Sequence, residues 1–228
     1  METFYSIFVC PGALAFDIGA NHGDRVEAFL SLGARVVAVE PQPHCVDDLR
    51  SRFGEREDVA IISAAVDSQT GRAIMHMSNN DTVSSLSDEW ISRVKAGGRF
   101  DDSTWEQKLE VTTITLDDLI EQYGVPDFIK IDVEGSELRA LNGLSTAVKV
   151  LSFEYTPEDI AAAVRCVERL ERLGRFVYNF SPGETWVMKM EQFVSKDGII
   201  AALTSLAGQK GEISGDVYAM LNEEPTNE

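Results

Sequence analysis

The nine residues FDIGANHGD (Phe16–Asp24) place a carboxylate near the end of an apolar strand and follow it with a glycine-rich turn into a helix. Gly19 and Gly23 allow the backbone to turn tightly and to come close to a ligand. The helix that begins near Gly23 has unpaired backbone N–H groups that a ligand can use. This pattern predicts a nucleotide-shaped site, and the plainer alternative is an ordinary strand-to-helix turn of an α/β protein.

Asp17 indicates which nucleotide-like ligand suits this turn. Two unit charges about 4 Å apart interact by roughly 4 kcal/mol at an effective dielectric constant of about 20, so this carboxylate disfavours a phosphate and favours a cation. S-adenosylmethionine (SAM) has an adenosine, no phosphate and a positively charged sulfonium. The spacing of Gly19 and Gly23 also differs from the Gly-x-Gly-x-x-Gly pattern of dinucleotide sites. An NAD-dependent oxidoreductase is therefore the second hypothesis, and a non-catalytic module that binds SAM or a nucleotide is the third.

The composition predicts a single domain over residues 1–228, because a chain of this length can bury one well-formed core. The net charge of -18 argues against a nucleic-acid partner, which would need clustered Lys and Arg side chains. Cys10, Cys45 and Cys166 lack Cys-x-x-Cys spacing, and the three histidines are equally scattered, which predicts a reducing compartment and no structural zinc. Since no stretch reaches the roughly 20 apolar residues of a membrane span, we expect a cytoplasmic protein with no membrane contact.

Apolar runs rich in β-branched residues alternate with helical patterns along most of the chain, and such continuous runs are typical of parallel strands buried on both faces. This alternation predicts a doubly wound, mostly parallel, seven-stranded α/β sheet. Thr115 and Asp118 resemble a capping box for a helix over residues 116–123. Residues 222–228 are expected to form a frayed tail. The expected strands are one that ends at Ile18, followed by 34–40, 59–66, 127–133, 149–155, 175–181 and 216–221.

The middle of the chain departs from this rhythm. Residues 72–78 and 110–115 alternate in polarity, which predicts a two-stranded excursion before the fourth strand. The polar segment 79–110 is expected to form a lid or acceptor loop, with a plain insertion as the alternative. Its Trp90 and Trp105 are expected either to stack on an acceptor molecule or to pack within the protein.

Ligands of such sheets bind beyond the carboxyl ends of the strands, so polar residues at those ends are candidates for the site. Glu40 follows the second strand, where ribose hydroxyls would bind, and Asp67 follows the third, where adenine would lie. Lys130, Asp132 and Glu134 would share one face of the fourth strand if the extended geometry continued that far. Because unpaired buried charge is costly, a functional role is favoured, and a structural salt bridge of Lys130 is the alternative.

Five motifs in order along the chain resemble the FkbM-type SAM-dependent methyltransferases: FDIGANHG, VVAVEPQP, SSL at Ser84–Leu86, TLDDL from Thr115, and DFIKIDVEGSE. The resemblance runs from about Phe16 to Tyr155. It implies the class I methyltransferase fold, SAM as cofactor, and transfer of a methyl group to oxygen, commonly a hydroxyl of a sugar or secondary metabolite. By position it implies a methionine-side loop of Asp17, Gly19, Asn21 and Gly23, a ribose acceptor at Glu40, and an edge at Asp132 and Glu134 where cofactor and acceptor meet.

A hydroxyl acceptor must lose its proton during methyl transfer, and a positioned base speeds such a step by roughly 100-fold or more. We expect Asp132 or Glu134 to be this base, with His44 as the alternative. Mg²⁺ bound by Asp132, Glu134 and Glu154 is a minor alternative, so no metal is predicted. The acceptor, the choice between O- and N-methylation, and the oligomeric state stay open. Candidates for contacts with the acceptor are Ser84, Ser85 and Glu154.

Overall fold

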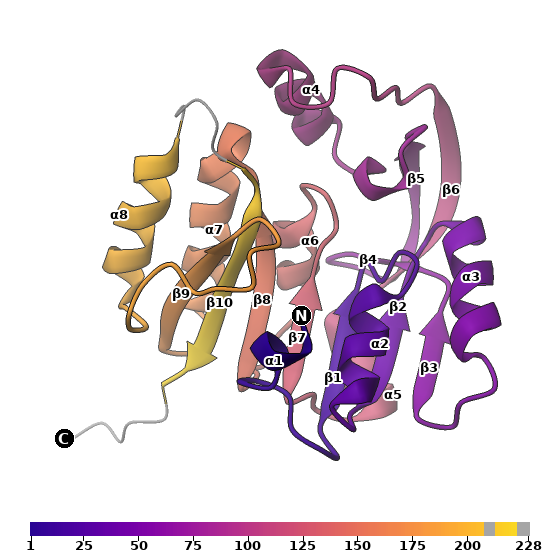
Figure 1. Cartoon of the computed structure of the whole chain (residues 1–228). Coiled ribbons are helices and arrows are strands. Elements are labelled where there is room, and N and C mark those ends of the chain that lie inside the picture. Colours follow the sequence, from indigo (N-terminus) through magenta and orange to yellow (C-terminus); the bar gives the residue numbers. More distant parts are fainter. Residues whose placement is uncertain (208–212, 223–228) are drawn as a thin grey trace.

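The computed structural model describes residues 1–207 and 213–222, and its main sheet has seven strands in that part of the chain (Figure 1). They are β1 (Leu14–Ile18), β2 (Arg35–Val39), β3 (Val59–Ile62), β7 (Phe128–Ile131), β8 (Val150–Tyr155), β9 (Phe176–Pro182) and β10 (Gly215–Leu221). Their order is β3-β2-β1-β7-β8-β10-β9, and every pair is parallel except those of β10, which runs antiparallel to β8 and β9. The prediction of a mostly parallel, seven-stranded α/β sheet is confirmed.

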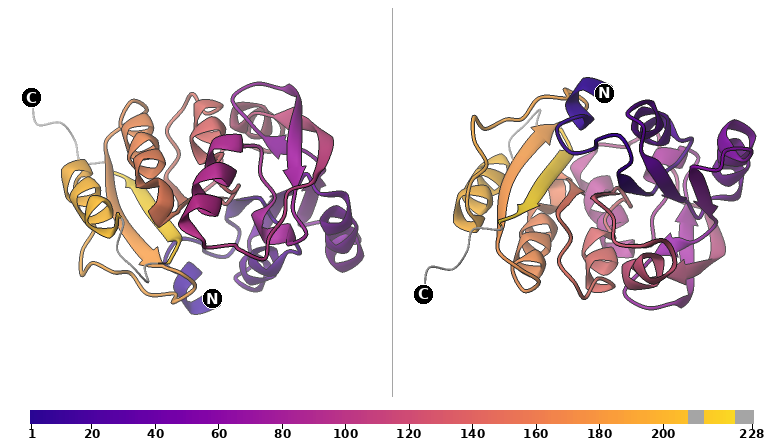
Figure 2. Two further views of the ribbon diagram at one scale, coloured as in Figure 1. Left: turned by 90° about the horizontal axis from the view of Figure 1, so that it is seen from above. Right: turned by 90° about the horizontal axis from the view of Figure 1, so that it is seen from below.

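Helices cover both faces of this sheet (Figure 2). One face packs against α1 (Glu2–Tyr5), α2 (Asp24–Ser31) and α3 (Pro43–Phe53). The other packs against α5 (Leu116–Tyr123), α6 (Glu137–Asn142), α7 (Ile160–Leu170) and α8 (Lys196–Leu206). Because side chains alternate along a strand, Ala15 joins the first core and Phe16 and Ile18 join the second. The interior strand β1 is fully buried, and Asp17 is its one charged residue.

Local signals place several helix boundaries where the sequence predicts them. Gly23 has a positive φ of 89° and is the N-cap of α2. The Thr115 hydroxyl accepts a hydrogen bond from the Asp118 N–H at 3.0 Å, and the Asp118 carboxylate accepts one from the Thr115 N–H at 3.2 Å. This capping box confirms the predicted start of α5.

The prediction of one strand over residues 59–66 is wrong, because these residues are divided between two sheets. The N–H of Ala64 donates to the carbonyl of Ile62 at 3.1 Å, a tight turn that a continuous strand cannot contain. After this turn β4 (Ala65–Val66) leaves the main sheet and pairs with β6 (Gln107–Ile114), which also pairs with β5 (Gly71–Met77). The excursion therefore has three strands rather than two.

The 79–110 segment carries η1 (Asp81–Val83) and α4 (Asp88–Gly97), and it has a small core of its own. Trp90 is 1% exposed and donates to the Thr156 hydroxyl at 3.0 Å, just before η2 (Pro157–Asp159). Trp105 donates to the carbonyl of Val83 at 2.7 Å. Both tryptophans therefore pack within the protein and do not present a stacking surface to an acceptor.

Two further expectations concern the ends of the chain and the membrane. The tail predicted at 222–228 lies outside the described residues except for Asn222, whose N–H donates to the carbonyl of Arg175. No helix in the described ranges is both long enough and apolar enough to cross a membrane.

Candidate functional site

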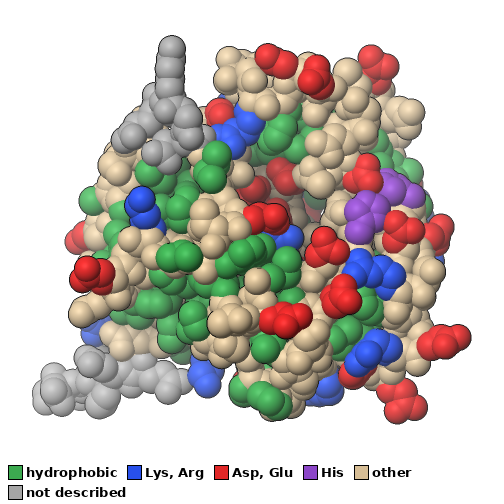
Figure 3. Space-filling model, in the orientation of Figure 1, with side chains coloured by type: hydrophobic (Ala, Val, Ile, Leu, Met, Phe, Trp, Pro, Cys, Tyr) green, Lys and Arg blue, Asp and Glu red, His purple; other side chains and the backbone are tan. Residues whose placement is uncertain are grey.

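A cavity of about 410 Å³ opens at the carboxyl ends of the parallel strands, between the Gly19–Gly23 turn and the 79–110 segment. Figure 3 shows this hollow with acidic side chains inside it and histidine side chains at its rim. Its volume is within the range of about 300–1,000 Å³ found for small-molecule sites. The predicted site residues that line it are Gly19, Asn21, Gly23, Glu40, Ser84, Asp132, Glu134 and Glu154.

The glycine turn packs directly against the end of β7, which is the strand predicted over residues 127–133. Gly19 has a φ of 83°, and a Cβ atom there would lie 1.8 Å from the carbonyl oxygen of Asp132. Only glycine fits this position, since a side chain would clash with rigid backbone. Asn21 also has a positive φ of 48°, and its side-chain oxygen accepts from the His22 N–H at 2.8 Å.

Glu40 connects the glycine turn to the loop after β2. One carboxylate oxygen accepts from the Asn21 N–H at 2.9 Å, and the other accepts from the Gln42 N–H at 2.8 Å. Burial raises the pKa of Glu40, and these two backbone hydrogen bonds oppose that rise. Each carboxylate oxygen can accept a second hydrogen bond, so Glu40 keeps capacity for ligand hydroxyls on the cavity side.

Asp17 lies beneath the turn, completely buried, and does not itself line the cavity. Neither of its oxygens has a hydrogen-bond partner among the described residues. Burial raises the pKa of Asp17 to about 6, although the nearby cations Arg25 and Lys130 oppose the rise. A carboxylate kept in such a position destabilises the protein without a ligand, which points to a binding role.

Lys130 is also completely buried, and it joins carboxylates from two different strand ends. Its Nζ lies 3.0 Å from Asp132 Oδ2 and 2.9 Å from Asp216 Oδ1. Burial acts to raise the pKa of Asp132, but Lys130 and Arg25 outweigh it and the pKa is lowered. The structural salt bridge considered for Lys130 is thus present. Arg25 and Asp216 escaped the sequence analysis because they come from α2 and β10, far from the DVEG motif.

Glu134 does not share an extended strand with Asp132, contrary to expectation. The strand β7 ends at Ile131, and Glu134 has a positive φ of 50°. Even so, one carboxylate oxygen each of Asp132, Glu134 and Glu154 lie within 4.8 Å of one another. Burial raises the pKa of Glu134 and of Glu154 well above the usual range, and repulsion among these acids adds to the rise. Binding of Mg²⁺ by Asp132, Glu134 and Glu154 stays the alternative to the prediction of no metal.

Besides Asp17, three predicted residues lie outside the cavity lining. Asp67 forms an ion pair with Arg139 of α6 and accepts from the Ser68 N–H at 2.6 Å, so its carboxylate is already neutralised away from the site. The Ser85 hydroxyl donates to the backbone carbonyl of Glu134 at 2.5 Å and holds the 79–110 segment against that turn. His44 Nε2 lies 3.0 Å from Asp81 Oδ2 and does not point at the three clustered acids.

Two further side chains, those of Gln42 and Asp81, line the cavity although they were not predicted as site residues. Gln42 stands two residues after Glu40 and lines the cavity, and its side-chain oxygen has no hydrogen-bond partner among the described residues. Asp81 reaches it from η1, where no motif marks it. Only the position of Gln42, just beyond a strand end, was a usable signal.

Comparison with known proteins agrees with this architecture. Residues 17–174 match the family model of the methyltransferase FkbM domain. The chain belongs to the FkbM methyltransferase family. This confirms the resemblance that the glycine turn and the DVEG motif indicated. Arg25, Lys130 and Glu40 lie within the part of the chain that matches this FkbM domain, whereas Asp216, the second partner of Lys130, lies beyond it.

The FkbM chain is 31% identical over 141 residues to a hexuronic acid methyltransferase, AglP, of Haloferax volcanii. That alignment covers 60% of this chain and 52% of the relative, so the chain spans about half the length of this curated relative. Two solved structures are also similar. Precorrin-6y C5,15-methyltransferase of Geobacter metallireducens has 12% identity, a TM-score of 0.49, and coverage of 96% of this chain and 85% of that one. Fibrillarin of Aeropyrum pernix, with natively bound SAM, has 11% identity, a TM-score of 0.48, and coverage of 93% and 68%.

Proposed function

We propose that this chain is a SAM-dependent methyltransferase that acts on a hydroxyl oxygen of a sugar or a similar small metabolite. The observation that carries the proposal is the negative charge of a cavity built on a glycine turn. Among the described lining residues Arg25 is the only Lys or Arg, and the carboxylates are Asp24, Glu40, Asp81, Asp132, Glu134, Glu154, Glu184 and Asp216. This charge attracts the sulfonium and ammonium groups of SAM and repels the phosphates of NAD.

The residues present fit SAM at three points. Gly19 has no side chain, so the turn packs directly against the Asp132 backbone at the edge of the cavity, and Asn21 lines the cavity from the same turn. Glu40 has acceptor capacity that suits the two ribose hydroxyls. Asp132 is held as an anion by Lys130 and suits the ammonium group. We therefore assign the ribose to Glu40 and the methionine side to Gly19, Asn21 and Asp132, supported from below by Asp17.

When bound, SAM supplies an electrophilic methyl group on a sulfonium leaving group. The protein must orient an acceptor oxygen, which can contribute on the order of 7–11 kcal/mol, and must take up its proton. Glu134 and Glu154 suit proton uptake, because both line the cavity and because burial and repulsion from neighbouring acids raise their pKa values, which makes each carboxylate a stronger base. Asp132 is a weaker base because its pKa is lowered. We assign the general base to the Glu134–Glu154 pair.

The charge of the cavity also bears on the acceptor. The relative AglP is named for a hexuronic acid, whose carboxylate would meet Asp132, Glu134 and Glu154 in this chain. Like charges a few ångströms apart repel by several kcal/mol at an effective dielectric constant of about 20. We therefore propose a neutral sugar hydroxyl as the acceptor, and we expect a neutral methyl glycoside to be methylated faster than the matching uronic acid.

Glu134→Gln and Glu154→Gln test the assignment of the base. Each variant should lower the initial rate of methyl transfer by about 100-fold or more while S-adenosylhomocysteine (SAH) still binds. Glu184→Gln is the matched control, because Glu184 lines the same cavity but its side chain is 70% exposed. Full turnover in both test variants would show that neither glutamate is the base.

Ligand-induced thermal shifts test the cofactor independently of the acceptor. A ligand at 100 times its dissociation constant stabilises the folded state by about 2.7 kcal/mol. SAH should raise the Tm of the wild-type protein, and NAD⁺ should leave it unchanged. The reverse result would favour the oxidoreductase hypothesis, and no shift with either ligand would favour a protein that does not bind nucleosides.

We also propose that the protein is located in the reducing cytoplasm. Cys10, Cys45 and Cys166 are all free thiols, and cysteines stay reduced in that compartment. The partner we propose is a small-molecule acceptor. The net charge of -18 argues against a nucleic acid in that role.

A further inference from the structure

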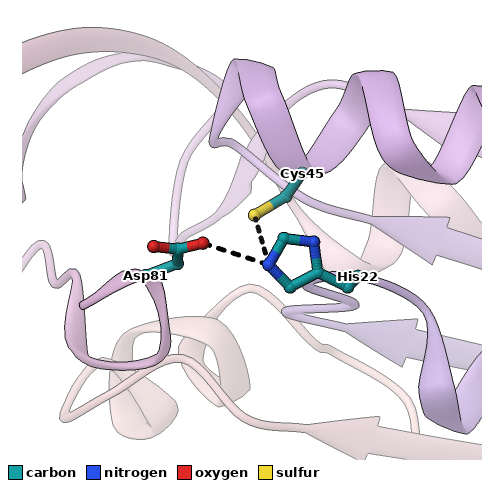
Figure 4. Close-up of side chains that lie close together, drawn as sticks. All are labelled: His22, Cys45 and Asp81. Carbon is teal, nitrogen blue, oxygen red and sulfur yellow. Dashed lines mark hydrogen bonds and ion pairs between the residues drawn. The ribbon is translucent and has the colours of Figure 1, made fainter. Parts of the chain in front are cut away.

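Four potential metal ligands from three separate segments meet at the rim of the cavity. His22 comes from the glycine turn, His44 and Cys45 from the first turn of α3, and Asp81 from η1. His22 Nε2 lies 3.0 Å from Asp81 Oδ2 and 4.0 Å from Cys45 Sγ (Figure 4). His44 Nε2 lies 3.0 Å from the same Asp81 oxygen and 3.3 Å from Cys45 Sγ.

We propose that this cluster binds one Zn²⁺ through His22, Cys45 and Asp81, with His44 as the fourth ligand. A set of imidazole nitrogen, thiolate sulfur and carboxylate oxygen is typical of zinc, whereas Mg²⁺ and Ca²⁺ select oxygen alone. Tetrahedral zinc with bonds of about 2.0–2.3 Å places its ligand atoms about 3.4–3.6 Å apart. Within the set of His22, Cys45 and Asp81, the separations of 3.0 and 4.0 Å lie on both sides of that range, so small side-chain rotations suffice for these three ligands. The His44 imidazole, whose ring centroid lies 6.2 Å from that of His22, must turn further to become the fourth ligand.

A carboxylate behind the cluster supports this assignment. Asp48 Oδ2 lies 2.7 Å from His22 Nδ1, the ring nitrogen opposite the one that faces Asp81. Zinc-binding histidines commonly donate their second ring N–H to a carboxylate, which leaves the first nitrogen free to coordinate the metal. Asp48 therefore sets the imidazole in the form that a metal requires.

The cluster is also accessible to an incoming ion. Cys45 is buried, but the side chains of His22 and His44 are 41% and 51% exposed, and that of Asp81 is 34% exposed. Zinc can thus enter from solvent through the histidines and reach the sulfur beneath them, where it replaces the thiol proton.

A metal at this place would link the 79–110 segment to the glycine turn. Asp81 belongs to the 79–110 segment, and His22 follows Asn21, whose N–H binds Glu40. Zinc would therefore fix the 79–110 segment to the glycine turn and hold one wall of the cavity. The inference rests on the four ligands and does not depend on the proposed methyl transfer.

Metal titration of the metal-free full-length protein tests the site. Equilibrium dialysis against Zn²⁺ should give one ion per chain, and Co²⁺ should give the intense visible bands of a tetrahedral site together with a thiolate-to-cobalt charge-transfer band. Cys45→Ser and Asp81→Asn should each weaken zinc binding by about 100-fold or more, and His44→Gln by about tenfold or more. The matched controls are Cys10→Ser, an exposed thiol elsewhere, and His76→Gln, whose imidazole pairs with Asp88.

Thermal unfolding gives a second readout that does not require catalysis. Zinc at 100 times its dissociation constant should raise the Tm of the wild type and of both controls by about 5–10 °C, and should leave Cys45→Ser unchanged. Equal zinc affinity in the wild type and in Cys45→Ser, or loss of the ion in Cys10→Ser, would overturn the proposal. Since SAH binding is measured separately, failure of the zinc site and failure of the methyltransferase proposal are distinguishable.

Discussion

Replacing Asp17 by Asn should reduce the loss of folding stability that the ligand-free protein undergoes as pH rises from 5 to 8. Asp17 is completely buried, and its oxygens have no hydrogen-bond partner in the described ranges. Burial raises its pKa from the ordinary 3.8 to about 6, against the opposing Coulomb attraction of Arg25 and Lys130. The folded protein therefore binds this proton more tightly than the unfolded chain does. The contribution of Asp17 to stability is fully present below about pH 4 and is lost as pH rises toward about 6.

The magnitude follows from these two pKa values. Their difference corresponds to roughly 3 kcal/mol of stability lost between the acidic limit and pH 8. About half of this loss, roughly 1.4 kcal/mol, falls between pH 5 and pH 8. Asn does not titrate, so Asp17→Asn should gain that amount relative to the wild type over this interval. The gain corresponds to a difference in Tm of about 3–6 °C for a chain of this size.

Urea unfolding of both proteins at pH 5 and pH 8, without ligand, measures this gain. Replacing the carboxyl group of Asp17 by an amide also changes the unfolding free energy by an amount that does not depend on pH. This amount cancels when the results at pH 5 and pH 8 are subtracted. Glu57→Gln serves as the control, since Glu57 is exposed. A difference in unfolding free energy that stays the same at pH 5 and pH 8 would refute the claim that burial disfavours the ionised form of Asp17.

Three further substitutions test separate parts of the site and fold. Gly19→Ala should abolish SAH binding and cost more than about 2 kcal/mol of stability, seen by calorimetry and urea unfolding, because its Cβ would lie 1.8 Å from a backbone oxygen at a φ of 83°. Glu40→Gln should weaken SAH binding by about 10- to 150-fold in calorimetry, through loss of charge-assisted hydrogen bonds; unchanged affinity would exclude Glu40 as the ribose acceptor. Thr115→Ala should lower the Tm by about 2–4 °C through loss of the capping box, with SAH affinity unchanged.

Local patterns in the sequence were enough to predict the seven-stranded sheet and the helix α5. Continuous apolar runs mark strands because a strand between two helical layers is buried on both faces. The capping pair Thr115 and Asp118 marks the start of α5 because its hydrogen bonds join residues only three apart. Gly19, Asn21, Gly23 and Glu40 were recognisable for a similar reason, since each stands directly at a strand end or in the turn that follows it.

Local patterns failed where backbone geometry changes within a few residues. The turn at Ala64 ends β3 within the run 59–66, directly after the exposed Ser63, and the positive φ of Glu134 ends the extended geometry after β7. Hydrophobic periodicity is read over many residues, so it does not detect a turn that changes the backbone direction within one or two residues. The pairing of Asp67 with Arg139 likewise depends on where α6 packs.

The sequence by itself determined the order of strands and helices, the glycine turn and the acids at the strand ends, because these features depend on residues near one another in the chain. The tertiary structure alone decided which charges meet. Lys130 finds Asp216 on a distant strand, and His22 finds Cys45 and Asp81 across three segments that appear scattered in the sequence. Electrostatic attraction and metal coordination depend on distances of a few ångströms in space, and only the packing of the sheet and its helices sets those distances.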